Sequence, residues 1–146
     1  MRLVRVLVVD DSVTIRAMMR QVLESDPEIR VAGLAASADE ADRLLQDNLV
    51  DVITLDIEMP GRNGIEYLSD IRRTRGTPVI MLSSHAGRGD QTRAQCLLMG
   101  AAGCFHKANA VREKDQLIQL VKDAAHREAR LDGEDRAALE AARAAE

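Results

Sequence analysis

The sequence predicts an α/β fold in which helices cover both faces of a five-stranded parallel sheet. Five short runs rich in Val, Ile and Leu alternate with segments whose apolar residues recur every three or four positions, which is the period of one helix face. The strand runs are almost continuously apolar, as is typical of strands covered on both faces. Alternating strands and helices favour parallel pairing through right-handed crossovers. The prediction is therefore a doubly wound sheet.

The first half of the chain contains three of the predicted strands. Ser12 or Asp11 can cap the helix that follows the first strand, and Pro27 lies just past the end of that helix. Ser37 and Glu40 have the spacing of a capping box before the second helix. The three strands are expected at residues 3–9, 30–35 and 50–56.

The second half of the chain continues the alternation. Residues 59–64, "MPGRNG", form a loop by their Pro and Gly content, and helical segments follow this loop and residue 89. The last two strands are expected at 79–84 and 103–107, and the last helix of the core is expected to begin near Val111.

The chain beyond residue 125 differs from the rest in composition. Gly133 interrupts it, and Ala dominates afterwards, with Asp132 as a possible helix cap. The apolar stripe of this segment is thin. We therefore expect one domain over residues 1–125 and a helical C-terminal extension over residues 126–146.

Composition limits the classes of function. The 146 residues have a net charge of -4 and 46% hydrophobic residues, so nucleic-acid binding is not expected. No apolar stretch is long enough to predict a membrane span, and the N-terminus lacks a secretory signal. A cytoplasmic protein is expected, with Cys96 and Cys104 as reduced thiols.

Polar side chains stand at the ends of four predicted strands. Asp10 and Asp11 follow the first strand, Asp56 ends the third, Ser83 the fourth and Lys107 the fifth. The carboxyl ends of parallel strands share one edge, where ligands bind. Oxygen ligands suit Mg²⁺, and a carboxylate beside it can attack phosphorus, while a lysine and a hydroxyl bind phosphoryl oxygens.

The predicted strand ends lie in four motifs, "VLVVDDS", "LDIEMPGRNG", "PVIMLSS" and "HK". At these spacings the motifs resemble the receiver domain of two-component response regulators over about residues 3–125. Together with "DPEIRVAGLA", they are most similar to the receivers of chemotaxis methylesterases. The resemblance implies a flavodoxin-like fold with strand order 2-1-3-4-5. The catalytic domain of the methylesterases is not expected here, because no residues remain to build it.

The resemblance also implies roles for individual residues. Asp56 matches the phospho-accepting aspartate, Lys107 the phosphate-binding lysine and Ser83 the hydroxyl that moves onto the phosphoryl group. The metal site is expected to be formed by Asp10, Asp11, Asp56 and the main-chain carbonyl of Glu58. Two positions depart from the family pattern: Cys104 replaces an aromatic residue, and Ala108 replaces a proline.

The expected function is that of a phosphorylated response regulator in chemotaxis-type signalling. A histidine kinase or phosphotransfer protein would phosphorylate Asp56, and the output would be contact with a protein target that the sequence does not identify. Apart from its own phosphorylation and dephosphorylation, no enzymatic activity is expected. A docking module that needs no phosphorylation and a phosphate sink are the alternatives.

Two other classes of protein, a phosphatase and a nucleotide-binding fold, fit the sequence less well than a receiver domain. A Mg²⁺-dependent aspartyl-phosphate phosphatase would carry D-x-D-x-T after its first strand, whereas this chain has Asp-Asp-Ser-Val-Thr at residues 10–14. A nucleotide-binding fold would show G-x-G-x-x-G there, and that motif is also absent from this position.

Overall fold

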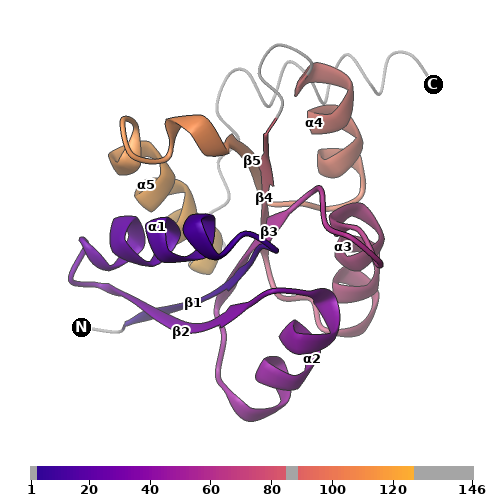
Figure 1. The fold of residues 1–146 in the computed structure, drawn as a ribbon, viewed down its shortest axis with the longest axis horizontal. Coiled ribbons are helices and arrows are strands. Elements are labelled where there is room, and N and C mark those ends of the chain that lie inside the picture. The colour runs from indigo at the N-terminus through magenta and orange to yellow at the C-terminus, as the bar shows by residue number, and fades with distance from the viewer. Residues whose placement is uncertain (1–2, 85–88, 127–146) are drawn as a thin grey trace.

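The computed structural model describes residues 3–84 and 89–126. Five parallel strands form a single sheet in the order β2-β1-β3-β4-β5, which confirms the predicted fold class and strand order (Figure 1). The strands are β1 (Val4–Val9), β2 (Ile29–Ala35), β3 (Val52–Asp56), β4 (Val79–Ser83) and β5 (Gly103–His106).

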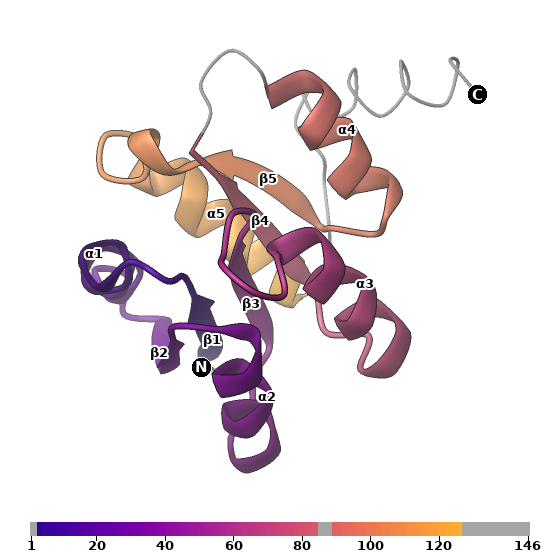
Figure 2. The same cartoon turned by 45° about the vertical axis from the view of Figure 1, so that its right-hand side comes forward.

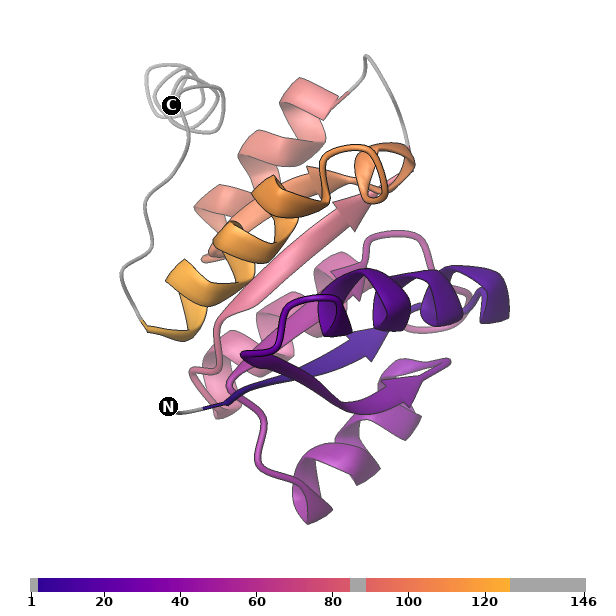
Figure 3. The same cartoon turned by 90° about the vertical axis from the view of Figure 1, so that its left-hand side faces the viewer.

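Helices cover both faces of this sheet. Helices α1 and α5 lie on one face and helices α2, α3 and α4 on the other (Figure 2), and α1 and α5 stand in front of the strands in Figure 3. Each face has its own apolar core, because alternate strand residues point to opposite sides. The helices are α1 (Val13–Glu24), α2 (Ala38–Asp47), α3 (Gly64–Thr74), α4 (Gly89–Leu98) and α5 (Lys114–Ala125).

Side-chain caps set the beginnings of the first three helices. Ser12, and not Asp11, caps α1, because its Oγ accepts a hydrogen bond from the amide of Ile15. Ser37 caps α2 by accepting from the amide of Glu40, as its spacing predicts. Asn63 caps α3 in the same way. The cap of α1 leaves Asp11 available at the edge of the sheet.

The last helix begins three residues later than predicted. A short 3₁₀ turn, η1 (Lys107–Asn109), follows β5 directly. The amide of Ala110 then bonds to the carbonyl of Lys107, and the amide of Glu113 to that of Asn109. These turns occupy the chain before α5, so Val111 lies exposed outside the helix. Lys107 is likewise the first residue of the turn and not the last of the strand.

The register of the sheet brings the carboxyl ends of the strands together. Val9 on β1 pairs with Leu55 on β3, and Asp56 pairs with Leu82 on β4. Ser83 pairs with His106 on β5. The polar residues that follow or end these strands therefore share one edge.

The predicted C-terminal extension lies outside the described residues, apart from His126 at the end of α5. None of the helices in residues 3–84 and 89–126 has the length and apolar content needed to cross a bilayer.

Candidate functional site

Asp56 is the central carboxylate of the candidate site. It ends β3, in the middle of the sheet, and is 1% exposed. Its Oδ1 accepts a hydrogen bond of 3.0 Å from the amide of Glu58 and lies 2.8 Å from Nζ of Lys107. Burial raises the pKa of Asp56 to about 6, helped by the charge of Asp10, while Lys107 and the Glu58 amide act in the opposite direction.

Asp10 is the second buried carboxylate, and it is fully inaccessible to solvent. Its Oδ1 accepts a 2.9 Å hydrogen bond from the amide of Ser12, and its Oδ2 lies 2.7 Å from Nζ of Lys107. Arg16 donates to the main-chain carbonyl of Asp10 at 2.7 Å. The turn from β1 into α1 thus fixes the orientation of this carboxylate.

Lys107 follows β5, and its ammonium group contacts both buried carboxylates. Its side chain is only 12% exposed. Burial alone lowers the pKa of an ammonium group, but the hydrogen bonds to Asp10 and Asp56 outweigh it and raise the pKa of Lys107. The side chain is therefore a cation at neutral pH, placed 2.7–2.8 Å from both carboxylates.

Asp11 completes an acidic group that suits a divalent cation. Asp10, Asp11 and Asp56 each offer one carboxylate oxygen, and these oxygens all lie within 4.8 Å of one another. Three carboxylates against the one ammonium of Lys107 leave two negative charges. Oxygen donors and this charge fit Mg²⁺, so the residues present match the group that the sequence implies.

Glu58 lies on the loop that follows Asp56. Its carboxylate accepts a 3.0 Å hydrogen bond from the hydroxyl of Ser84, so its side chain is engaged with the end of β4. Its amide is bonded to Asp56, as described above. The main chain of Glu58 is thereby held beside the acidic group, where the predicted carbonyl ligand would have to be.

Ser83 reaches the same edge of the sheet as the carboxylates. It directly follows Leu82, the partner of Asp56 in the sheet, and it is partly exposed. The structure thus places all six predicted residues at one edge. It joins Asp10, Asp56, Lys107 and the Glu58 amide by direct contacts, groups Asp11 by proximity, and places Ser83 by register.

Sequence reasoning missed two contacts that shape this edge. The Nδ1 of His106 accepts a hydrogen bond from the amide of Ala108 and so caps the short turn that begins at Lys107. The chain therefore leaves β5 at Lys107. Gly64 packs so closely under β3 that a Cβ there would overlap the carbonyl oxygen of Asp56. Gly64 was visible in the sequence as a loop residue, but its close approach depends on the path of the loop.

A 2-1-3-4-5 parallel sheet with buried aspartates and a lysine at its carboxyl edge defines a receiver-type signalling domain. The family model described as the response regulator receiver domain matches residues 6–122, and the chain belongs to this family. Phosphorylation on an aspartate is the general function of the family.

Relatives and solved structures agree with this assignment. The chain is 49% identical over 105 residues to a protein-glutamate methylesterase/protein-glutamine glutaminase of Agrobacterium fabrum, covering 72% of this chain and 30% of the relative. The response regulator domain of Thermotoga maritima CheB superposes with a TM-score of 0.78 at 34% identity, covering 86% of this chain and 98% of that one.

A third comparison concerns a structure solved with ligands. The CheX-CheY-BeF3-Mg²⁺ complex of Borrelia burgdorferi matches with a TM-score of 0.70 at 30% identity, covering 82% of this chain and 87% of that chain. Among the methylesterases, the first matches cover 30–35% of the relatives. The chain therefore spans about a third of the length of the curated relatives it matches.

Proposed function

We propose that Asp56 is the phosphoryl acceptor of this receiver domain. The observation that carries the proposal is the buried Asp56 carboxylate, held through Oδ1 by both Lys107 and the Glu58 amide. Because both contacts engage Oδ1, we assign the attack on phosphorus to Oδ2. The bond from Oδ2 to phosphorus forms as the bond from phosphorus to the donor breaks.

The neighbouring residues would bind the cation and the transferred group. Asp10, Asp11, Asp56 and the Glu58 carbonyl would hold Mg²⁺, which when bound offsets the negative charge of the acids and of the phosphoryl oxygens. The Lys107 ammonium would contact a phosphoryl oxygen as a point charge. Ser83 would donate its hydroxyl to another phosphoryl oxygen.

The partners follow from this chemistry. A histidine kinase or a phosphotransfer protein would supply the phosphoryl group in the cytoplasm, and the output would be contact with a protein target. The likeness to methylesterase receivers favours a chemotaxis-type pathway. We propose that this chain acts as a signalling receiver, catalysing only its own phosphorylation and dephosphorylation. A phosphate sink is the second candidate, since it uses the same site.

The domain boundary is also a proposal. The family match ends at residue 122, and α5 ends at Ala125. Both support a receiver domain over residues 1–125 and a separate extension over residues 126–146. A protein truncated after residue 126 should be phosphorylated at the wild-type rate.

Intact-mass spectrometry with acetyl phosphate and Mg²⁺ tests the proposed acceptor. The wild-type protein should gain the mass of one phosphoryl group, and Asp56→Asn should gain none. Asp47→Asn, which changes an exposed acid at the end of α2, is the matched control and should behave as the wild type. Undiminished labelling of Asp56→Asn would refute the assignment.

A further inference from the structure

The loop that follows Asp56 (residues 57–63, the β3–α3 loop) is anchored at its start by hydrogen bonds and by the side chain of Met59, which is 7% exposed and packs in the apolar core. The amide of Ile57 bonds to the carbonyl of Leu82 on β4, and the carbonyl of Ile57 accepts from the amide of Gly64. The amide of Glu58 bonds to Asp56. These contacts tie the start of the loop to the candidate site.

Beyond Met59, the outer part of the same loop has little packing to hold it. Pro60 and Gly61 are exposed, and Gly61 has a φ of 77°. An open hollow of about 430 Å³ lies against the loop, lined by residues of the loop and of the start of α3. Space on that side allows the loop to shift unless another contact prevents it.

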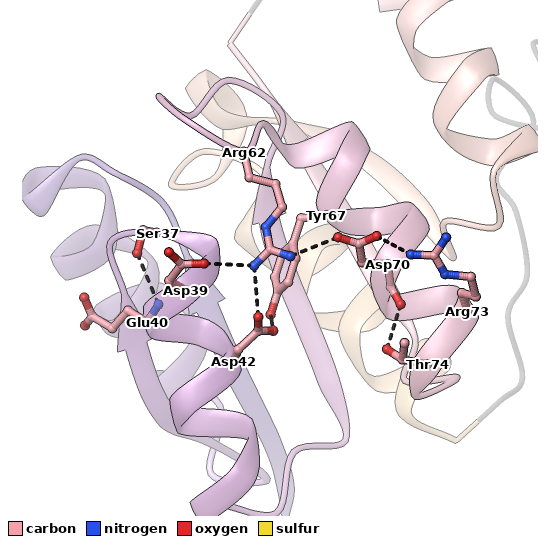
Figure 4. A network of polar contacts seen from close by, with 9 residues as sticks. All are labelled: Ser37, Asp39, Glu40, Asp42, Arg62, Tyr67, Asp70, Arg73 and Thr74. Atoms are coloured by element: carbon pink, nitrogen blue, oxygen red, sulfur yellow. Dashed lines mark hydrogen bonds and ion pairs between the residues drawn. The ribbon is translucent and has the colours of Figure 1, made fainter.

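Arg62 supplies that contact. Its Nη1 donates to Asp70 on α3 at 2.9 Å, and its Nη2 lies 2.9 Å from Asp42 and 3.2 Å from Asp39, both on α2 (Figure 4). The guanidinium group also lies over the ring of Tyr67, 4.8 Å from its centroid. One side chain from the loop thus joins two helices.

The partners of Arg62 are themselves fixed. The hydroxyl of Tyr67 donates to Asp42 at 2.7 Å, and the Tyr67 ring is buried at 1% exposure. Arg73 pairs with the other oxygen of Asp70 at 2.7 Å, but its side chain is exposed and does not touch the loop (Figure 4). A planar guanidinium group can bridge carboxylates on two helices, whereas a lysine would offer only a point charge.

We propose that Arg62 is a positioning residue for the Asp56 site. It contacts α2 and α3 and not the site, but it fastens the outer part of the β3–α3 loop and so holds the main chain of Glu58 against Asp56. The amide of Glu58 then keeps its bond to Oδ1, and its carbonyl keeps its place for the cation. The part of this inference that concerns Mg²⁺ rests on the proposed function.

Two measurements on the full chain test this role. Amide hydrogen exchange without metal reports whether the Glu58 amide stays bonded to Asp56. Titration with Mg²⁺, followed by amide chemical shifts, reports the dissociation constant for the cation. The variants are Arg62→Ala and Arg62→Lys, and the matched control is Arg73→Ala, which removes another cation from Asp70 without touching the loop.

The proposal predicts a local effect. In Arg62→Ala, exchange of the Glu58 and Gly64 amides should accelerate at least tenfold, amides of Val8 and Leu55 in the sheet should keep their rates, and the Mg²⁺ dissociation constant should rise three- to tenfold. Arg62→Lys should fall between the wild type and Arg62→Ala in both readouts. Arg73→Ala should match the wild type.

Other results would overturn the proposal. Equal acceleration across the sheet in Arg62→Ala and Arg62→Lys would show that Arg62 only adds global stability. A Mg²⁺ dissociation constant within twofold of the wild type would show that Arg62 does not position the site. If the wild-type protein bound no Mg²⁺, the proposed function would fail, and Glu58 exchange alone would decide whether Arg62 holds the loop against Asp56.

Discussion

Two groups of three aspartates in this protein each meet a basic side chain, and they differ in burial. Asp10 and Asp56 are 0% and 1% exposed around Lys107. The second group consists of Asp39, Asp42 and Asp70 around Arg62, and their side chains are 88%, 44% and 31% exposed. Water can solvate the surplus charge of the second group but has little access to the first. The buried group is therefore the one whose surplus negative charge a bound cation would stabilise.

The two basic side chains also differ in what they join. Arg62 links side chains on two helices, and its contacts leave its guanidinium group held on several sides. Lys107 is the first residue of the turn after β5, and its ammonium group lies between Asp10 and Asp56. An ammonium group acts as a point charge, so it can exchange one oxygen partner for another without the planar geometry that a guanidinium group requires. This difference supports the two proposals, in which Arg62 fastens a loop and Lys107 binds a phosphoryl oxygen.

The largest expected difference between the two groups concerns removal of the basic side chain, Lys107 or Arg62. Lys107→Met leaves the buried carboxylates of Asp10 and Asp56 without a cation and should cost about 3–5 kcal/mol of unfolding free energy without metal. Arg62→Ala should cost about 1 kcal/mol, because its ion pairs are solvated. Urea denaturation at pH 7.5 measures both. Added Mg²⁺ should restore part of the loss in Lys107→Met, through preferential binding to the folded state. Equal losses for the two variants would contradict the comparison.

The next effect concerns the pH dependence of stability. The pKa of Asp56 in the folded protein, about 6, lies above its ordinary value of 3.8. Between these pH values the folded protein holds a proton that the unfolded chain has lost, so the metal-free wild type should lose stability as pH rises through about 6.

Asp56→Asn should lack this loss and should be more stable than the wild type at pH 7.5 by about 1–3 kcal/mol. Urea denaturation between pH 4 and pH 8 in the presence of a chelator measures the difference between the two proteins. Asp39→Asn, in the exposed group, should follow the wild type throughout. A constant difference between Asp56→Asn and the wild type across this range would rule out the buried charge as its cause.

The smallest effect on stability is expected at Asp11, the exposed member of the first group. Asp11→Asn should change the metal-free unfolding free energy by less than about 0.5 kcal/mol, as surface substitutions usually do. The same change should raise the Mg²⁺ dissociation constant at least tenfold, because it removes a charged oxygen ligand. Calorimetric titration measures this constant, with Asp47→Asn, at an exposed acid at the end of α2, as the control. A large loss of metal-free stability would mean that Asp11 has a structural role instead.

The sequence predicted that the candidate site residues lie at one edge of the sheet, because strand ends are visible in the hydrophobic pattern. Asp10, Asp56 and Lys107 each stand where an apolar run stops, and parallel pairing alone brings such positions together. The start of the last helix was predicted wrongly, because the turns after Lys107 depend on hydrogen bonds that leave no periodic signal. The role of Ser83 as the mobile hydroxyl stays a prediction.

The fastening by Arg62 could not be predicted in the same way. Asp39 and Asp42 are three residues apart and so share a helix face, which was a usable signal for a shared cation. Which cation they meet depends on how α2 and α3 lie beside each other, and the sequence does not encode that placement locally. The burial of Tyr67, which supports the ring contact with Arg62, is also a property of the packed helices.

The most direct test of the account is to map the phosphorylated residue. The protein is treated with acetyl phosphate and Mg²⁺ and then with borohydride, which reduces an acyl phosphate to an alcohol and converts the aspartate to homoserine. Peptide mass spectrometry then locates the change. The account predicts homoserine at position 56, dependent on Mg²⁺ and absent when a chelator replaces the metal. Homoserine at Asp10, Asp11 or an aspartate of the exposed group, with residue 56 unchanged, would contradict it.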